Sequence, residues 1–263
     1  MPNETLHVGA VRRLSARVGI ALTKIDRVLL HVDVATRPLA DVKRALTVYW
    51  EDFNRFPDQW TSGFMPWEAA LFDRWVRPDD RLLLIGCGSG RDLAAMIPRV
   101  AEIVAVEPAS ESLEIARRSI RSNGRPLTLL HGFVEDVELN GTFDVCWFSY
   151  FSYSYIPDCP RRVSILRRLA ARLRPGGRIV LTCVCQPRPP RSRAFRIGQF
   201  ASRLVRNDWQ LAAGDELLRG QSAQTFHFQH VFSPEELESE VAGAGLRVIG
   251  SHFPEALVVA APD

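Results

Sequence analysis

Residues 81–92, RLLLIGCGSGRD, decide which fold this chain adopts. Leu82–Ile85 is a continuous apolar run, which is typical of a strand buried on both faces of a parallel sheet. Gly86, Gly88 and Gly90 follow this run directly, and a stretch that is predicted to be helical begins after them. Glycine lets the chain turn sharply and lets a ligand approach main-chain N–H groups closely. The stretch therefore predicts a strand, a tight turn and a helix that together hold a nucleotide-like ligand.

The spacing of the glycines and a downstream acid narrow the choice of ligand. In the dinucleotide-binding fingerprint the third glycine stands five residues after the first, whereas here Gly90 stands four residues after Gly86 and Arg91 takes the fifth place. Ile103–Val106 is predicted to be the second strand, and Glu107 is the acid at its end that binds ribose hydroxyl groups. The GxGxG turn followed by this acid resembles the class I S-adenosylmethionine-dependent methyltransferases.

Later segments extend the resemblance over about residues 64–186 and 230–261. FDV at 143–145 is similar to the start of the family's fourth strand, LRPGG at 173–177 to its turn into strand five, and FSPEEL at 232–237 to its C-terminal end. The resemblance implies an α/β fold of the Rossmann-like methyltransferase type. We expect a seven-stranded, mostly parallel sheet with its last strand antiparallel and helices on both faces, together with an N-terminal helical extension and an insertion after strand five.

The chain outside this core is predicted to form two additions. Residues 1–63 are expected to be a helical extension that includes a lid, and residues 64–263 the S-adenosylmethionine-binding domain, in which an insertion at about 186–232 covers the active site. Val8–Leu30 places apolar residues on one helical face and basic residues mostly on the other. We expect the apolar stripe to pack on the domain, although a basic amphipathic helix can also bind an anionic membrane surface or RNA. Leu39–Phe53 is predicted to be a second helix.

The resemblance also implies which residues bind the cofactor. They lie in the glycine turn and after strands two, three and four: Gly86, Cys87, Gly88, Gly90, Glu107, Pro108, Phe133, Val134, Glu135 and Ser149. Phe133 stands where the family commonly has an acid, so adenine is expected to stack or pack there, with the backbone of Val134 and Glu135 contacting its edge. Leu84 also departs from the pattern, since the family commonly has an acid at that position. Asp92 is the candidate to compensate for it.

The residues expected to contact the acceptor come from three separate segments: Trp60, Phe64, Tyr150, Tyr153 and His227. Methyl transfer from a sulfonium is an in-line displacement, so the protein mainly positions the reactants. An oxygen or nitrogen acceptor that must lose a proton needs a base. The candidate catalytic residues are His230 and Tyr150. Histidine is the natural base because it titrates near neutrality, although a lone histidine is more often structural. Trp60 and Phe64 fit a lid and the core equally well.

Composition and cysteine usage limit the other possibilities. The chain has 263 residues and a net charge of +3, which does not by itself imply a nucleic-acid partner. No apolar run approaches the roughly 20 residues of a membrane span. The chain has five cysteines, which is an odd number, and most of them lie in or beside predicted strands. This pattern indicates reduced thiols and a cytoplasmic protein. Cys183 and Cys185 lack a further pair at zinc-ligand spacing, so no metal is expected. Without Asn-Pro-Pro-Tyr after strand four, no DNA partner is expected either.

Three hypotheses for the function follow. The first is transfer of a methyl group from S-adenosylmethionine to O or N of a small-molecule acceptor, anionic if the arginines of the insertion bind it. The second is methylation of a lipid or macromolecule, served by the basic N-terminal helix. The third is a non-catalytic methyltransferase-like binding protein, since Leu84 replaces an acid and no base is certain. A homodimer remains open.

Overall fold

Two parallel pairings place the glycine-rich stretch at the centre of a seven-stranded sheet. The computed structural model describes residues 3–54, 63–187, 193–220, 222 and 225–261. In it, β1 (Arg81–Ile85) pairs in parallel with β2 (Glu102–Glu107) and with β4 (Phe143–Phe148). The strands follow the order β3 (Leu127–His131), β2, β1, β4, β5 (Leu173–Thr182), β10 (Ala256–Ala260) and β9 (Arg247–His252). β10 is antiparallel to both of its neighbours, which confirms the predicted sheet with its antiparallel last strand.

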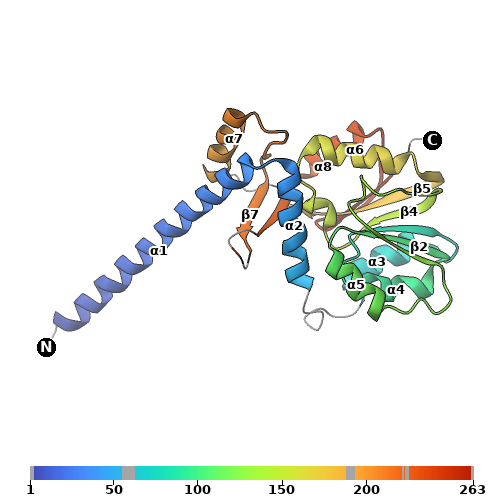
Figure 1. The fold of residues 1–263 in the computed structure, drawn as a ribbon, viewed down its shortest axis with the longest axis horizontal. Coiled ribbons are helices and arrows are strands. Elements are labelled where there is room, and N and C mark those ends of the chain that lie inside the picture. The colour runs from blue at the N-terminus through green and yellow to red at the C-terminus, as the bar shows by residue number, and fades with distance from the viewer. Residues whose placement is uncertain (1–2, 55–62, 188–192, 221, 223–224, 262–263) are drawn as a thin grey trace.

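Helices cover both faces of this sheet (Figure 1). One face packs against α3 (Pro66–Trp75), α4 (Arg91–Met96) and α5 (Ser110–Ser119). The other packs against α6 (Cys159–Ala170) and α8 (Pro234–Gly243). The described residues also contain the short 3-10 helices η2 (Ile97–Arg99) and η3 (Ser152–Tyr155). The predicted α/β fold with helices on both faces is confirmed.

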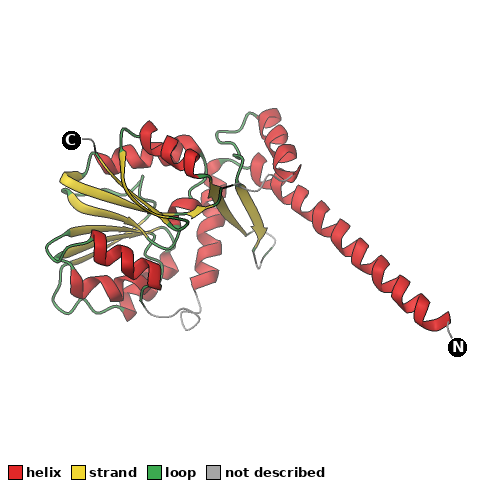
Figure 2. Ribbon diagram, turned by 180° about the vertical axis from the view of Figure 1, so that it is seen from behind, coloured by secondary structure: helices red, strands yellow, loops and turns green. Residues whose placement is uncertain are grey.

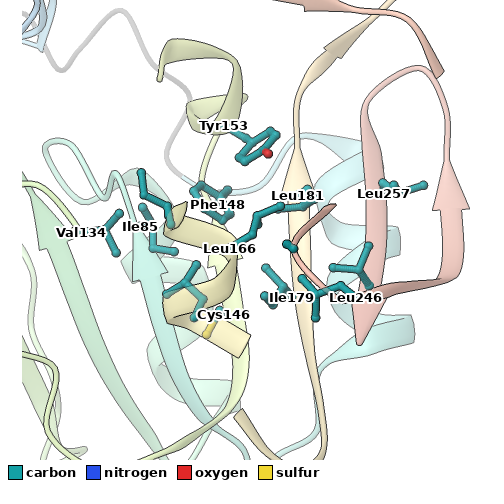
Figure 3. Packing of buried hydrophobic residues seen from close by; sticks show 14 of the residues in the cluster. Ile85, Val134, Cys146, Phe148, Tyr153, Leu166, Ile179, Leu181, Leu246 and Leu257 are labelled. Atoms are coloured by element: carbon teal, nitrogen blue, oxygen red, sulfur yellow. The ribbon is translucent and has the colours of Figure 1, made fainter. Parts of the chain in front are cut away.

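The sequence of β1 explains why both faces are buried. Leu82 and Leu84 belong to the apolar cluster under α3, α4 and α5, whereas Leu83 and Ile85 belong to the cluster under α6 and α8. Side chains of a strand alternate between its two faces, so an unbroken apolar run must be covered on both. Figure 3 shows the second cluster, in which Ile85 lies with residues of β4, β5 and α6.

The N-terminal extension consists of α1 (Asn3–Thr36) and α2 (Leu39–Asn54). α1 projects away from the rest of the molecule, whereas α2 lies against it (Figures 1 and 2). Our expectation that the apolar stripe of α1 packs on the domain is wrong for its described part. Val18, Leu22, Ile25 and Leu29 are each 49–61% exposed. In the described part of the helix, the buried apolar residues begin at Leu30, in its last turns.

The insertion forms a second, three-stranded sheet and a helix. β6 (Val184–Cys185) and β7 (Asp215–Arg219) flank β8 (Phe226–Phe232), and α7 (Arg193–Val205) packs on α1. The end of α1 shares one apolar cluster with α2, β7 and β8. Polar contacts join the same parts, since Asn207 donates hydrogen bonds to the carbonyl oxygens of residues 35 and 37. The extension and the insertion therefore have a common core.

Two predicted helix ends differ from the structure. We predicted a helix over 161–173, but α6 ends at Ala170 and Leu173 already belongs to β5, where it pairs with Phe143. Ser110 is the first residue of α5 rather than its cap, and its hydroxyl donates a hydrogen bond to Glu51 of α2. No helix in the described part of the chain is long and apolar enough to cross a membrane.

Candidate active site

The glycine turn after β1 adopts backbone conformations that favour glycine. Gly86, Gly88 and Gly90 all have positive φ, at 76°, 52° and 98°. The N–H of Gly86 donates to the carbonyl of Val106 over 2.9 Å, and that of Gly88 donates to Oε2 of Glu107 over 2.7 Å. The hydrogens of these two amides are used within the protein, so our expectation that the N–H groups of the turn face the ligand is wrong for Gly86 and Gly88. The turn serves instead by letting a ligand lie close against the bare main chain.

Glu107 is held at the end of β2 by two main-chain amides. Besides Gly88 on Oε2, the N–H of Ala109 donates to its Oε1 over 2.9 Å. Burial raises the pKa of Glu107 to about 7, and the two hydrogen bonds oppose that rise. A carboxylate offers about four lone-pair sites, so each oxygen can accept one further hydrogen bond from a hydroxyl group in the cavity.

One cavity joins the glycine turn to α2 and to the end of β4. It contains about 1160 Å³ of empty space, a volume that includes the open solvent at its mouth. Nine of the ten predicted cofactor residues line it: Gly86, Cys87, Gly88, Glu107, Pro108, Phe133, Val134, Glu135 and Ser149. These residues fit a cofactor of this kind, because a glycine main chain and a strand-end carboxylate face the same space.

Gly90 is the predicted cofactor residue that does not line the cavity. A Cβ atom at this position would lie 2.7 Å from Cγ1 of Ile120. Glycine is required at this position because the turn approaches the end of α5 closely, so the role of Gly90 is packing.

Cations from two helices lie over Phe133, at the end of the cavity where adenine is expected. Nζ of Lys43 lies 4.0 Å from the centre of the Phe133 ring and pairs with Glu135 over 3.1 Å and with Asp136 over 2.7 Å. Arg161 of α6 also pairs with Glu135. Adenine can stack on Phe133 only where these side chains leave the ring uncovered.

α2 provides cavity residues that the sequence analysis missed. They lie along one face of the helix: Lys43, Leu46, Thr47, Trp50 and Phe53. Their spacing of three or four residues is the signal that could have identified them, since such spacing places side chains on one side of a helix. Other lining residues that were not predicted include Ser89, Arg91, Ser152 and Tyr155.

Aromatic rings form the cavity wall away from the glycine turn. The ring centres of Trp50 and Tyr155 are 4.7 Å apart, and those of Trp50 and Phe53 are 5.1 Å apart. Burial raises the pKa of the Tyr155 phenol above its ordinary value, so its hydroxyl stays protonated at neutral pH. His227 lies behind this wall, in contact with Trp50 and Tyr155, and burial lowers its pKa to about 4. It does not line the cavity as a substrate contact would.

Tyr150 lines the cavity from a strained position at the end of β4. It has φ of 38° and Phe151 has φ of 61°, which non-glycine residues rarely adopt. The N–H of Phe151 donates to Oγ1 of Thr182 over 2.8 Å, and its ring stacks on Trp67 with centres 5.2 Å apart. These contacts hold the loop so that Tyr150 faces the cavity, with the guanidinium of Arg91 4.8 Å from its ring centre.

A buried ionic network supports this side of the cavity. Arg91 contacts Glu68 over 2.5 Å and Asp92 over 2.6 Å, and Ser149 donates to Asp92 over 2.5 Å. Burial raises the pKa of both carboxyl groups. Asp92 itself does not line the cavity, so it acts on the site through Arg91 and Ser149, which do. Leu84 is part of the apolar core.

His230, our candidate base, lies outside the cavity lining. Its Nδ1 lies 2.6 Å from Asp215 Oδ1 and its Nε2 lies 3.1 Å from Glu236 Oε1. Burial lowers the pKa of His230, but the bonds to both carboxylates outweigh that effect and raise it overall. A histidine enclosed in this way joins β7, β8 and α8, and catalytic duty for it does not fit the structure.

Tyr153 and Phe64 are core residues rather than substrate contacts. The hydroxyl of Tyr153 donates to Oε2 of Glu240 over 2.7 Å, and its ring is fully buried against Phe232. Phe64 packs against Phe72 with ring centres 5.0 Å apart. Trp60 lies outside the described residues.

Comparisons with known proteins agree with this geometry. Residues 82–177 match the family described as "Methyltransferase domain". The chain is 31% identical to the cypemycin N-terminal methyltransferase of a Streptomyces species over 114 residues, 41% of this chain and 46% of that one. It is 27% identical to the ubiquinone biosynthesis O-methyltransferase of Bordetella avium over 231 residues, 82% of this chain and 86% of that one. The chain spans less than two thirds of the length of the first relatives it matches.

Solved structures share the fold at low sequence identity. The CcbJ methyltransferase from Streptomyces caelestis has a TM-score of 0.59 and 18% identity, with 82% of this chain and 98% of that one covered. The 1,6-didemethyltoxoflavin-N1-methyltransferase of Burkholderia thailandensis has a TM-score of 0.58 and 19% identity, with 86% and 89% covered. Residues 82–177 thus match a methyltransferase domain, within a chain that has the fold of the class I S-adenosylmethionine-dependent methyltransferases.

Proposed function

We propose that this chain transfers the methyl group of S-adenosylmethionine to O or N of a small-molecule acceptor. The observation that carries the proposal is the single cavity that joins the glycine turn and Glu107 to an aromatic wall. The relatives support both atom types, since one is named an N-terminal methyltransferase and the other an O-methyltransferase.

In this proposal the residues around the turn hold the cofactor. Glu107 accepts hydrogen bonds from the ribose hydroxyls, and the main chain of residues 86–89 lies against the ligand. Phe133 and Val134 contact adenine, while Ser149 and Arg91 lie near the amino-acid end. When bound, S-adenosylmethionine supplies an activated methyl group and a good leaving group.

The aromatic wall positions the acceptor. Trp50 and Tyr155 present ring faces that suit a flat, largely apolar molecule. Tyr150 and Tyr155 can each offer a hydroxyl to its polar group, which fixes the acceptor atom and keeps water away from the transfer.

Two measurements test the proposal. Titration with S-adenosylhomocysteine should give one binding site per chain, and labelled S-adenosylmethionine should pass its methyl group into the low-molecular-weight fraction of a cell extract. Label found only in lipid, protein or nucleic acid would favour methylation of those molecules instead. Cofactor binding without label transfer would favour a non-catalytic binding protein, and no cofactor binding at all would overturn the assignment of the cavity.

A further inference from the structure

A surface on α1 and α7 exposes large apolar side chains in a regular pattern. We call it the α1–α7 surface and define it by Val18, Leu22, Ile25 and Leu29 of α1 and Ile197, Phe200 and Leu204 of α7. Each of these side chains is 46–69% exposed. We propose that the α1–α7 surface binds the anionic face of a lipid membrane. This inference goes beyond the proposed methyl transfer and does not depend on it.

The apolar residues occupy one face of each helix. On α1 they are spaced by four, three and four residues, and on α7 by three and four, which places each set on a single side. The opposite side of α7 is buried, with Ala194, Gly198 and Ser202 inward. The apolar stripe of α7 thus faces solvent opposite a buried side, whereas α1 is exposed on all sides over residues 16–27, so its apolar stripe is exposed as well.

The two helices form one packed unit. A Cβ atom at Gly198 would lie 2.8 Å from the carbonyl oxygen of His31, so α7 lies directly on the backbone of α1. Asn207, just beyond α7, donates a 2.8 Å hydrogen bond to the carbonyl of Ala35. The two exposed faces therefore belong to the same structural part, at the end of the molecule from which α1 projects (Figure 2).

Basic side chains accompany the apolar ones. Residues 16–30 and 193–206 hold seven basic residues, all exposed: Arg17, Lys24, Arg27, Arg193, Arg196, Arg203 and Arg206. They hold one acidic residue, Asp26, which pairs with Arg219 over 2.7 Å. The whole chain has an excess of only three basic residues, so the rest of the molecule is net acidic. The positive charge is concentrated where the apolar side chains are exposed.

These features favour an anionic lipid surface over a second copy of the chain. A helix that presents apolar residues beside arginines can lie in the membrane interface, with its apolar side among the acyl chains and its cations at the headgroups. Association of two such faces would also bury the apolar side chains. It would bring arginines of both copies together, however, and like charges in contact are unfavourable. An anionic lipid surface satisfies both the apolar and the basic side chains, whereas a second copy would satisfy the apolar ones alone.

Sedimentation of the full chain with lipid vesicles tests the inference. We compare vesicles of phosphatidylcholine alone with vesicles of phosphatidylcholine and phosphatidylglycerol in a 3:1 ratio. Affinity for the anionic vesicles should be at least about tenfold higher and should fall steeply in 0.5 M NaCl, since screening shortens the reach of the charges. Equal affinity for both kinds of vesicle, or binding to neither, would overturn the inference.

Matched variants test which residues are responsible. The double variant F200S/L204S and the double variant R196E/R203E should each lower affinity for anionic vesicles about tenfold or more. The controls V248S and R125E change exposed residues of other elements and should bind like the parent. Unchanged thermal unfolding of all four variants excludes a folding defect. If the parent instead formed a dimer that F200S/L204S dissociates, with no preference for anionic vesicles, the surface would be a subunit interface and the proposal would be wrong.

Discussion

The N–H of Gly88 donates a 2.7 Å hydrogen bond to Oε2 of Glu107, so the glycine turn and the strand-end carboxylate are directly joined. The two residues are 19 positions apart in the chain; Gly88 follows β1, and Glu107 is the last residue of β2. The contact sets the carboxylate against the cavity before any ligand arrives, which is the kind of preorganisation that lowers the cost of binding.

Replacing Glu107 should weaken cofactor binding. E107Q keeps the size of the side chain but loses the charge that ribose hydroxyls and the amides of Gly88 and Ala109 bind. Hydrogen bonds to a charged group contribute roughly 1.5–3 kcal/mol, so titration calorimetry should show affinity for S-adenosylhomocysteine lower by about tenfold to a hundredfold. E114Q, on the exposed side of α5, is the matched control and should bind like the parent.

Cofactor affinity should also depend on pH through the same residue. The pKa of Glu107 is raised to about 7 by burial, and a ligand that donates hydrogen bonds to the carboxyl group prefers its ionised form. Affinity should therefore fall as the pH falls below about 7 and be constant above it. Dissociation constants measured from pH 5.5 to 8.5 would show this, and an identical profile in E107Q would assign the dependence to another group.

A side chain at Gly88 should abolish cofactor binding. G88V places a branched side chain in the cavity and strains a backbone with φ of 52°. G124V is a matched control, because Gly124 has φ of 83° with nothing within 4 Å of an added Cβ. Both variants bear similar strain, but only the first should lose binding in a thermal-shift titration. Loss in both would mean that strain alone is responsible.

Two tyrosine variants separate the cavity from the core. Y150F removes the hydroxyl of a side chain that lines the cavity, so kcat/KM for the acceptor should fall about tenfold, as expected for the loss of one hydrogen bond, while cofactor affinity stays the same. Y153F removes a hydroxyl that is bonded to buried Glu240, so it should lower the melting temperature and leave kcat/KM unchanged. A larger effect of Y153F on kcat/KM would reverse these roles.

His230 should stabilise the fold most at low pH. Its bonds to Asp215 and Glu236 raise its pKa above the ordinary 6.5, so the native state binds the proton more tightly than the unfolded state. The stabilisation is complete below pH 6.5 and is lost as the pH rises through the folded pKa. In urea unfolding, H230Q should cost roughly 2 kcal/mol at pH 6 and clearly less at pH 9. An equal loss of stability at pH 6 and pH 9 would show that the imidazolium does not stabilise the fold. Loss of methyl transfer in a folded H230Q variant would restore a catalytic role for His230.

The sequence-based predictions were most accurate for elements that a local apolar pattern and the order of segments along the chain both indicate. Leu127–His131 and Phe143–Phe148 were identified to the residue, since buried strands show their apolar runs directly. Glu107 was placed correctly at the end of a strand beside the cavity, because parallel strands bring their carboxyl ends to one edge.

Contacts between distant segments were beyond such patterns. The alternation in β8 placed His230 on the buried face, but it could not show that Asp215 would lie opposite it in the antiparallel pair. In the same way, nothing local in α2 shows that Lys43 lies over Phe133. These residues are brought together by tertiary packing, and periodicity within one segment carries no information about its neighbour.

The core shared by the N-terminal helices and the insertion has a practical consequence for trimming this protein. Trp209 donates its indole N–H to the carbonyl of Arg37 and packs in a cluster with Leu30 and Val34. A truncated chain that starts at residue 64 would keep the seven-stranded sheet, yet it would remove the apolar residues of α1 and α2 from the insertion and expose Phe226 and Phe228 to water. The segment before residue 64 is therefore no detachable appendage, and cutting it away should yield an aggregation-prone fragment rather than a smaller stable domain.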